Sequence, residues 1–217
     1  MALRYQPFLL LVFGLAFTAL AAFGGGAPNP QSLDEKVKAF LDSRRGQWHD
    51  LNVPANDGRI LYDLVIKGHY KRALEIGTST GHSGIWIAWA LSKTGGKLIT
   101  VEIDEGRHRE AVANFATAGL SDYIDARLAD AHDLVPALKG PFDFVFCDAD
   151  KDWYKNYFVA VLPKIQAGGC FAAHNVSEGR GAWGTGEFLT YVRSLPSMET
   201  SLVPGSSAGI SISYKKK

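Results

Sequence analysis

Residues 73–84 read Ala-Leu-Glu-Ile-Gly-Thr-Ser-Thr-Gly-His-Ser-Gly, and this stretch decides the fold. The apolar run 73–76 predicts a buried strand, and the apolar residues in 85–91 predict a helix after the glycine-punctuated turn. Such a strand, turn and helix N-terminus form a cradle for a nucleotide or a carboxylate, because glycines allow close approach and the first helical N–H groups face the ligand. The spacing G-x-x-x-G-x-x-G differs from the dinucleotide fingerprint G-x-G-x-x-G, so a nicotinamide enzyme is the weaker interpretation.

A second predicted strand ends in Glu102, about 20 residues beyond the turn, where such folds place a carboxylate for ribose hydroxyls. The pattern of Glu75, Gly77 and Gly81 followed by this acid resembles the class I methyltransferases that use S-adenosylmethionine (SAM). Within that class the chain resembles the small catechol and caffeoyl-CoA O-methyltransferases, from about Leu51 to its C-terminus. The resemblance implies that SAM is the cofactor and that Glu75, Gly77, Gly81 and Glu102 help to bind it.

Strands and helices alternate along the chain, which predicts an α/β fold with a doubly wound parallel sheet and an antiparallel hairpin at its last edge. With the resemblance, we expect a Rossmann-like methyltransferase sandwich: a mostly parallel seven-stranded sheet, antiparallel in its last strand, with helices on both faces. The predicted strands cover 73–76, 97–102, 124–128, 142–147, 170–173, 201–203 and 209–214, and the predicted helices about 33–45, 57–68, 85–91, 105–118, 153–161 and 187–194.

Composition narrows the function classes. The net charge of +1, with both signs interspersed, argues against a nucleic-acid partner. The length fits one domain with a short appendage. Cys147 and Cys170 fall in predicted core strands, which favours buried thiols over a disulfide or a reactive pair.

Residues 1–30 are predicted to lie outside the fold. Arg4 precedes an apolar run, 8–23, and a glycine- and proline-rich linker follows it. These features fit a signal peptide, but the run is also nearly long enough for a membrane anchor. A membrane-anchored domain and an exported one therefore both stay open, and the methyltransferase domain is expected over 31–217.

Two strand ends bring polar groups together. Asp148 follows the strand 142–147, and His174 and Asn175 follow the strand 170–173. Neighbouring strands lie about 5 Å apart, so these side chains can reach one ion. The resemblance implies that Asp148 ligates a divalent metal and borders the cofactor, and that His174 and Asn175 stand where the family has its next ligands, an Asp-Asn pair.

Lys151, which follows Asp148 in the same motif, corresponds to the family's base. In this interpretation Mg²⁺ or Mn²⁺ binds both oxygens of a catechol and lowers their pKa. Lys151 takes the proton, since a nearby cation depresses its own pKa, and the phenolate attacks the methyl group in line. The alternatives are a surface lysine paired with Asp148 or Asp150, and a capping or loop carboxylate for Asp148.

His174 departs from the family pattern. An imidazole suits Mn²⁺, Fe²⁺ or Zn²⁺ better than Mg²⁺, and it removes one negative ligand charge. Three readings stay open: a metal held by Asp148, Asn175 and His174; His174 as a general base without a metal; or a degenerate site.

Four further residues are candidates by resemblance. Val53 is expected to offer its backbone to the SAM carboxylate, Ser83 to bind the same carboxylate, and Asp130 to meet the adenine amine. Their alternatives are a plain loop for Val53 and helix capping for Ser83 and Asp130. Trp183 is expected to form an aromatic wall on the acceptor, as an exposed loop tryptophan is more often functional.

The sequence therefore predicts a SAM-dependent O-methyltransferase that acts on a small aromatic, catechol-like hydroxyl with divalent-metal assistance. The second hypothesis is a SAM-binding domain that does not methylate small molecules, such as a sensor or a membrane-tethered scaffold. A nicotinamide oxidoreductase is third. The acceptor and the oligomeric state, including a homodimer, are left open.

Overall fold

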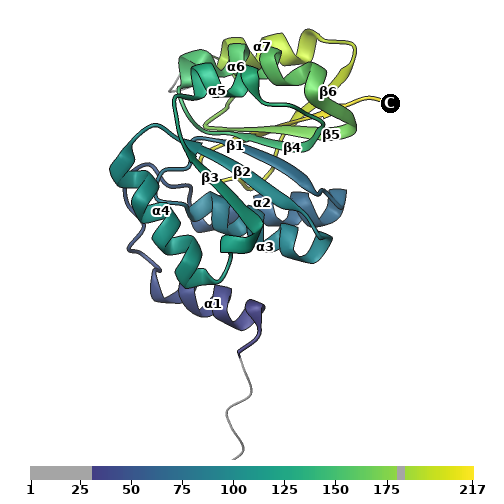
Figure 1. Cartoon of the computed structure of the whole chain (residues 1–217). Helices are drawn as coiled ribbons and strands as arrows, with labels where there is room; N and C mark the ends of the chain where they lie inside the picture. The colour runs from purple at the N-terminus through teal and green to yellow at the C-terminus, as the bar shows by residue number, and fades with distance from the viewer. Residues whose placement is uncertain (1–30, 180–183) are drawn as a thin grey trace, which may run out of the picture. The chain divides into compact units, whose positions relative to one another are not determined.

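The described strands form one sheet in the order β3-β2-β1-β4-β5-β7-β6 (Figure 1). The computed structural model describes residues 31–179 and 184–217. Strands β1 to β5 run parallel, and β7 lies antiparallel between β5 and β6, which confirms the predicted sheet. The strands are β1 Arg72–Ile76, β2 Lys97–Glu102, β3 Ile124–Leu128, β4 Phe142–Cys147, β5 Ile165–His174, β6 Met198–Leu202 and β7 Ile210–Lys215.

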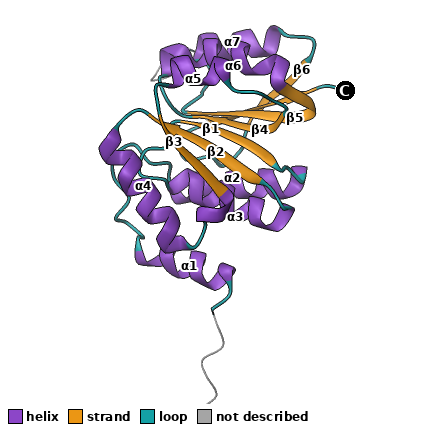
Figure 2. Cartoon of the chain, in the orientation of Figure 1, coloured by secondary structure: helices purple, strands orange, loops and turns teal. Residues whose placement is uncertain are grey.

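Helices cover both faces of this sheet (Figure 2). Helices α5, α6 and α7 lie on one face, and α1 to α4 lie on the other (Figure 1). Side chains alternate along each strand, so Val145 packs with the first group while its neighbour Phe144 packs with α2 and α3. The helices are α1 Leu33–Ser43, α2 Ala55–Gly68, α3 His82–Thr94, α4 Glu105–Ala118, α5 Ala131–Ala137, α6 Tyr154–Val161 and α7 Gly186–Ser194.

Most predicted element bounds are confirmed, and local chemistry explains several of them. Ser32 caps α1 through a capping box with Glu35. Gly119, with a φ of 78°, ends α4 in the left-handed region. Strand β5 begins at Ile165, earlier than expected, because the exposed residues 166–168 separate the buried Ile165 from the buried segment that carries the apolar signal.

The strand order reverses between β1 and β4, which lie side by side at the centre of the sheet. In open α/β sheets the ligand crevice forms outside the carboxyl ends of the strands at such a reversal. The segments that follow β1, β2, β4 and β5 all leave the sheet at this edge, so the fold brings the predicted motifs to one place.

The predicted signal peptide or membrane anchor, residues 8–23, and its linker lie outside the described residues. That prediction stays a prediction. Within 31–179 and 184–217, no helix is long and apolar enough to cross a membrane.

Candidate active site

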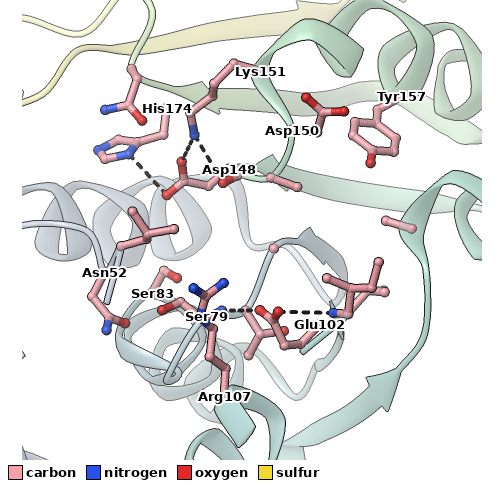
Figure 3. A pocket seen from close by; sticks show the side chains of 18 of the residues that line it. Asn52, Ser79, Ser83, Glu102, Arg107, Asp148, Asp150, Lys151, Tyr157 and His174 are labelled. Carbon is pink, nitrogen blue, oxygen red and sulfur yellow. Dashed lines mark hydrogen bonds and ion pairs between the residues drawn. The ribbon is translucent and has the colours of Figure 1, made fainter. Parts of the chain in front are cut away.

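A pocket of about 630 Å³ opens at the carboxyl ends of the central strands. Figure 3 shows Glu102, Ser79 and Arg107 on one side of it and Asp148, Lys151 and His174 on the other. For the roles that the sequence predicts for them, we call these sides the cofactor end and the acceptor end. Other described residues that line the pocket include Gly77, Ser83, Ala149, Asn175 and Ala208.

The glycines of the first motif are required by close packing. Gly77 has a φ of 99°, and a Cβ there would lie 2.9 Å from the backbone nitrogen of Ala149. This approach brings the turn after β1 against the chain that leaves β4 at Asp148. Gly81, with a φ of 98°, is the N-cap of α3, and a Cβ there would lie 2.6 Å from the ring of Phe115. Only glycine meets both demands at either position.

Glu102 is fixed at the end of β2 by backbone donors. Its Oε2 accepts from the N–H of Ser79 at 2.7 Å, and its Oε1 accepts from the N–H groups of Ile103 at 3.1 Å and Asp104 at 3.0 Å. Oε2, which accepts only one of these bonds, retains a lone pair that can accept from a hydroxyl. A preorganised acid that lines the pocket at this position suits the hydroxyls of a ribose.

Glu75 lies beneath the pocket and not on its wall. It is fully buried, and the hydroxyl of Thr100 donates to its Oε2 at 2.6 Å. Its Oε1 has no hydrogen-bond partner in the described part of the chain. Burial raises the pKa of Glu75 to about 8. The carboxyl group is therefore mostly protonated at neutral pH.

Asp148 is engaged on both carboxylate oxygens. The ammonium of Lys151 donates to Oδ1, and it also donates to the backbone carbonyl of Asp148 at 3.1 Å. Nδ1 of His174 lies 3.1 Å from Oδ2. The structure thus brings Asp148, Lys151 and His174 together as predicted, and Asn175 lines the same end of the pocket.

A second acid, Asp57 on α2, lies behind His174. Its Oδ2 is 3.0 Å from Nε2 of His174. Although burial lowers the pKa of His174, the hydrogen bonds and charges of Asp148 and Asp57 raise it above the ordinary value. Sequence reasoning missed Asp57, and its only signal was an acidic residue in the first turn of an otherwise apolar-faced helix.

Three further predictions have mixed outcomes. Ser83 and Asp130 line the pocket, and Asp130 also caps α5 by accepting from the N–H of His132 at 2.8 Å. Both roles considered for Asp130 thus stay compatible with its position. Trp183 lies outside the described residues, so its role as an acceptor wall stays a prediction.

Val53 does not line this pocket. Its carbonyl faces Nδ1 of His82 at 2.8 Å, and the residue borders a second cavity of about 700 Å³ between α1, α2 and α3. Its neighbour Asn52 lines both cavities, and its side chain accepts from the N–H of His82 at 3.1 Å and donates to the hydroxyl of Thr80 at 2.6 Å. Asn52 is therefore the polar side chain of this loop at the cofactor end, and sequence reasoning missed it.

His132 and Tyr157 were also missed. Their rings stack with centroids 5.6 Å apart at the rim of the pocket, and Nε2 of His132 lies 3.3 Å from Asp150. Flat rings on the pocket wall are suited to contact with a nucleobase.

The acidic and histidine side chains of the pocket do not by themselves form a complete metal site. Within the described ranges, no three side chains of His, Cys, Asp or Glu converge on one metal position. Asp148 and His174 are a pair, and a further protein ligand would have to be an amide such as that of Asn175.

Known O-methyltransferases are similar to this chain in sequence. A family model described as "O-methyltransferase" matches residues 27–181. A catechol O-methyltransferase of Niastella koreensis is 39% identical over 130 residues, which cover 58% of this chain and 58% of that protein. A catechol O-methyltransferase of Mycobacterium tuberculosis is 31% identical over 171 residues, covering 71% and 76%. The chain thus spans little more than half of the first of these relatives.

Solved structures agree on the fold. The O-methyltransferase TomG from Streptomyces achromogenes, solved in complex with SAM, has a TM-score of 0.70 to this chain at 26% identity. The match covers 85% of this chain and 91% of that structure.

Proposed function

The chain belongs to the O-methyltransferase family, and on that premise we propose that it transfers the methyl group of SAM to a hydroxyl of a small aromatic, catechol-like acceptor. One observation carries the proposal: a single pocket holds the fixed carboxylate of Glu102 at one end and the pair of Asp148 and Lys151 at the other. Residues 31–217 are proposed to carry this activity, and 1–30 to be a signal peptide or a membrane anchor.

At the cofactor end, Glu102 would accept from the ribose hydroxyls of SAM. The first turn of α3, with Ser83 on the pocket wall, presents backbone N–H groups that suit the SAM carboxylate. Asp130 and the ring of Tyr157 border the position expected for the adenine. These contacts bind and orient the cofactor, which is most of what an in-line transfer requires.

At the acceptor end, Lys151 is the proposed base. Asp148 holds the Lys151 side chain in the pocket. The lysine acts as a base after it has released a proton to solvent, and Asp148 stabilises the ammonium that forms again when the neutral amine takes the acceptor proton. The side chain of Lys151 is about 18% exposed and that of Asp148 about 9%, so both work in a partly dehydrated site where their attraction is stronger than in water.

The resemblance implies a divalent metal, and the donors at this end suit a borderline ion better than Mg²⁺. Asp148 offers an oxygen and His174 a ring nitrogen on facing sides, and the other ring nitrogen of His174 is held by Asp57. Metal-binding histidines usually have such a carboxylate partner. We propose Asp148, His174 and Asn175 as ligands for an ion such as Mn²⁺, which would supply Lewis-acid activation of the acceptor oxygens.

The test is turnover with a panel of catechols and simple phenols. The full-length protein is incubated with SAM and each acceptor in Mg²⁺, in Mn²⁺ and in EDTA, and methylated product is detected by mass spectrometry. We expect catechol product that is strongest with Mn²⁺ and lost in EDTA. Product that persists in EDTA would contradict the proposed need for a metal, and His174 would then replace Lys151 as the proposed base.

The alternative is a domain that binds SAM without methylating a small molecule. His174 supports this alternative because it stands where the family has an aspartate ligand. Calorimetry with SAM separates the two. Saturable SAM binding with no product from any acceptor would favour the alternative and overturn the proposed reaction.

A further inference from the structure

We propose that Asp57 is a positioning residue of this site: it fixes the imidazole of His174 so that Nδ1 meets Asp148 at the acceptor end. The inference rests on the proposed function for its catalytic consequence. Its geometric part concerns only the contacts among Asp57, His174 and Asp148.

Asp57 is fully buried, which is costly for a carboxylate unless each oxygen is well paired. Its Oδ1 accepts from the hydroxyl of Ser206 at 3.0 Å and from the N–H of Ser207 at 2.7 Å. Its Oδ2 accepts from the N–H of Ala208 at 3.1 Å and faces Nε2 of His174 at 3.0 Å. The hydrogen bonds from His174 and this turn outweigh the effect of burial and hold the pKa of Asp57 below its ordinary value.

The position of Asp57 in α2 does not by itself explain these contacts. An acid in the first helical turn commonly accepts from the helix's own N–H groups or lies near them in solvent. The carboxylate of Asp57 instead accepts from the turn between β6 and β7, and it reaches the end of β5 at His174. It therefore joins three separate parts of the fold at the back of the acceptor end.

The contact fixes the orientation of the His174 ring and places a proton on Nε2. Both oxygens of Asp57 accept from the turn between β6 and β7, and Oδ2 also accepts from Nε2 of His174. His174 is 4% exposed, and a turned ring would leave a buried N–H without an acceptor. The ring is thus held with Nδ1 towards Oδ2 of Asp148, whose other oxygen binds Lys151.

Asp57 therefore acts on the acceptor end through His174 and Asp148, without lining the pocket itself. The cofactor end is independent of it, because Glu102 is held by backbone donors of the turns after β1 and β2. Loss of the Asp57 charge should impair methyl transfer and leave SAM binding intact.

The experiment compares Asp57→Asn with Ser206→Ala in the full-length protein. Asn keeps the size of Asp57 but loses the charge and turns one acceptor into a donor. Ser206→Ala removes a hydrogen bond from the same cluster and leaves the carboxylate on His174. Carboxylate partners of metal-binding histidines typically contribute about 10–100-fold to metal affinity or activity, so we expect kcat to fall by that factor in Asp57→Asn with an unchanged Kd for SAM. Ser206→Ala should lower the Tm and retain kcat.

A spectroscopic signature separates positioning from simple support of the fold. Long-range ¹H–¹⁵N NMR of the histidine rings reports which nitrogen is protonated, and His174→Gln identifies the signals of His174. In the unchanged protein Nε2 of His174 should be protonated, and in Asp57→Asn the Nε2 signal should move while the signals of His82 stay.

The proposal is overturned if the His174 signals are the same in Asp57→Asn, or if kcat is unchanged. It is also overturned if kcat falls with Tm in Ser206→Ala as steeply as it does in Asp57→Asn. A protein that methylates no acceptor would refute the proposed function, and the NMR comparison would still decide whether Asp57 fixes His174.

Discussion

Nδ1 of His174 lies 3.1 Å from Oδ2 of Asp148, and this contact joins the carboxyl ends of β5 and β4 at the acceptor end of the pocket. The ammonium of Lys151 binds the other carboxylate oxygen of Asp148. With both oxygens engaged, the carboxylate has one preferred orientation, and it holds Lys151 where we propose that an acceptor hydroxyl enters.

Replacing Lys151 by Met should abolish most of the turnover. A positioned acid or base typically contributes about 10²- to 10⁴-fold, and Met fills similar space without a proton-accepting group. The Kd for SAM should be unchanged because Lys151 lies at the other end of the pocket. Initial rates of product formation and calorimetry with SAM measure the two effects.

Lys155→Met is the matched control for Lys151→Met. Lys155 is an exposed lysine on α6 whose ammonium lies 4.6 Å from the ring centroid of Tyr191, away from the pocket. It should retain full turnover. Equal rates for the two variants would remove Lys151 from the mechanism.

Glu102→Ala should weaken SAM binding by about tenfold or more, because it removes a charged acceptor and leaves three backbone N–H groups without their partner. Glu105→Ala, at an exposed acid paired with Arg109 on α4, is the control and should bind SAM normally. Calorimetric titration with SAM measures both. An unaltered Kd in Glu102→Ala would place the cofactor elsewhere.

Gly77→Ala should cost both stability and SAM binding. The new Cβ would strain a backbone with a φ of 99° and would also meet the backbone of Ala149. Gly95→Ala is the control, because Gly95 has a φ of 76° but no atom within 4 Å of a built Cβ. We expect Gly95→Ala to lose about 1 kcal/mol and Gly77→Ala clearly more in urea unfolding. Similar losses would show that the approach to Ala149 is unimportant.

Because of Glu75, the free energy of unfolding should decrease as the pH rises from about 4.5 to about 8. The unfolded chain releases this proton near its ordinary pKa of 4.5, whereas the folded chain holds it to about 8. Between these values the folded state binds the extra proton, so each pH unit favours unfolding by at most about 1.4 kcal/mol. Glu75→Gln, which can still accept from Thr100, should remove the Glu75 part of this slope and leave the part that comes from the raised pKa of His174.

Urea unfolding at several pH values between 5 and 8, without SAM, measures the slope of the free energy of unfolding. Glu105→Gln, at the exposed acid on α4, should leave the slope unchanged. If Glu75→Gln has the slope of the original protein, Glu75 is ionised in the folded state at neutral pH.

The parts of the fold that local chemistry determines were predictable from the sequence. The strand, glycine turn and helix at 72–94 have a strong local pattern, and so do the helix caps at Ser32 and Gly119. Asp148 and His174 could be brought together because each follows a strand of a parallel sheet, and such strands end at one edge.

Contacts that depend on distant segments were not predictable in this way. Asp57 and His174 are 117 positions apart, and Asp57 meets Ser207 across 150 positions. No local pattern pairs them, since each pairing depends on how α2 packs beside the turn between β6 and β7. The same holds for Val53: the contact with His82 decides which side of the loop faces the pocket, and it leaves Asn52 on the pocket wall.

The most direct test of the central claim follows the methyl group itself. The full-length protein is incubated with SAM labelled with ¹³C in the methyl group and with catechol, in Mn²⁺, and both products are quantified by mass spectrometry. The account predicts ¹³C-labelled monomethyl catechol and S-adenosylhomocysteine in equal amounts, and no label on catechol with Lys151→Met. Saturable SAM binding with no label on catechol or on any related hydroxyl would contradict it.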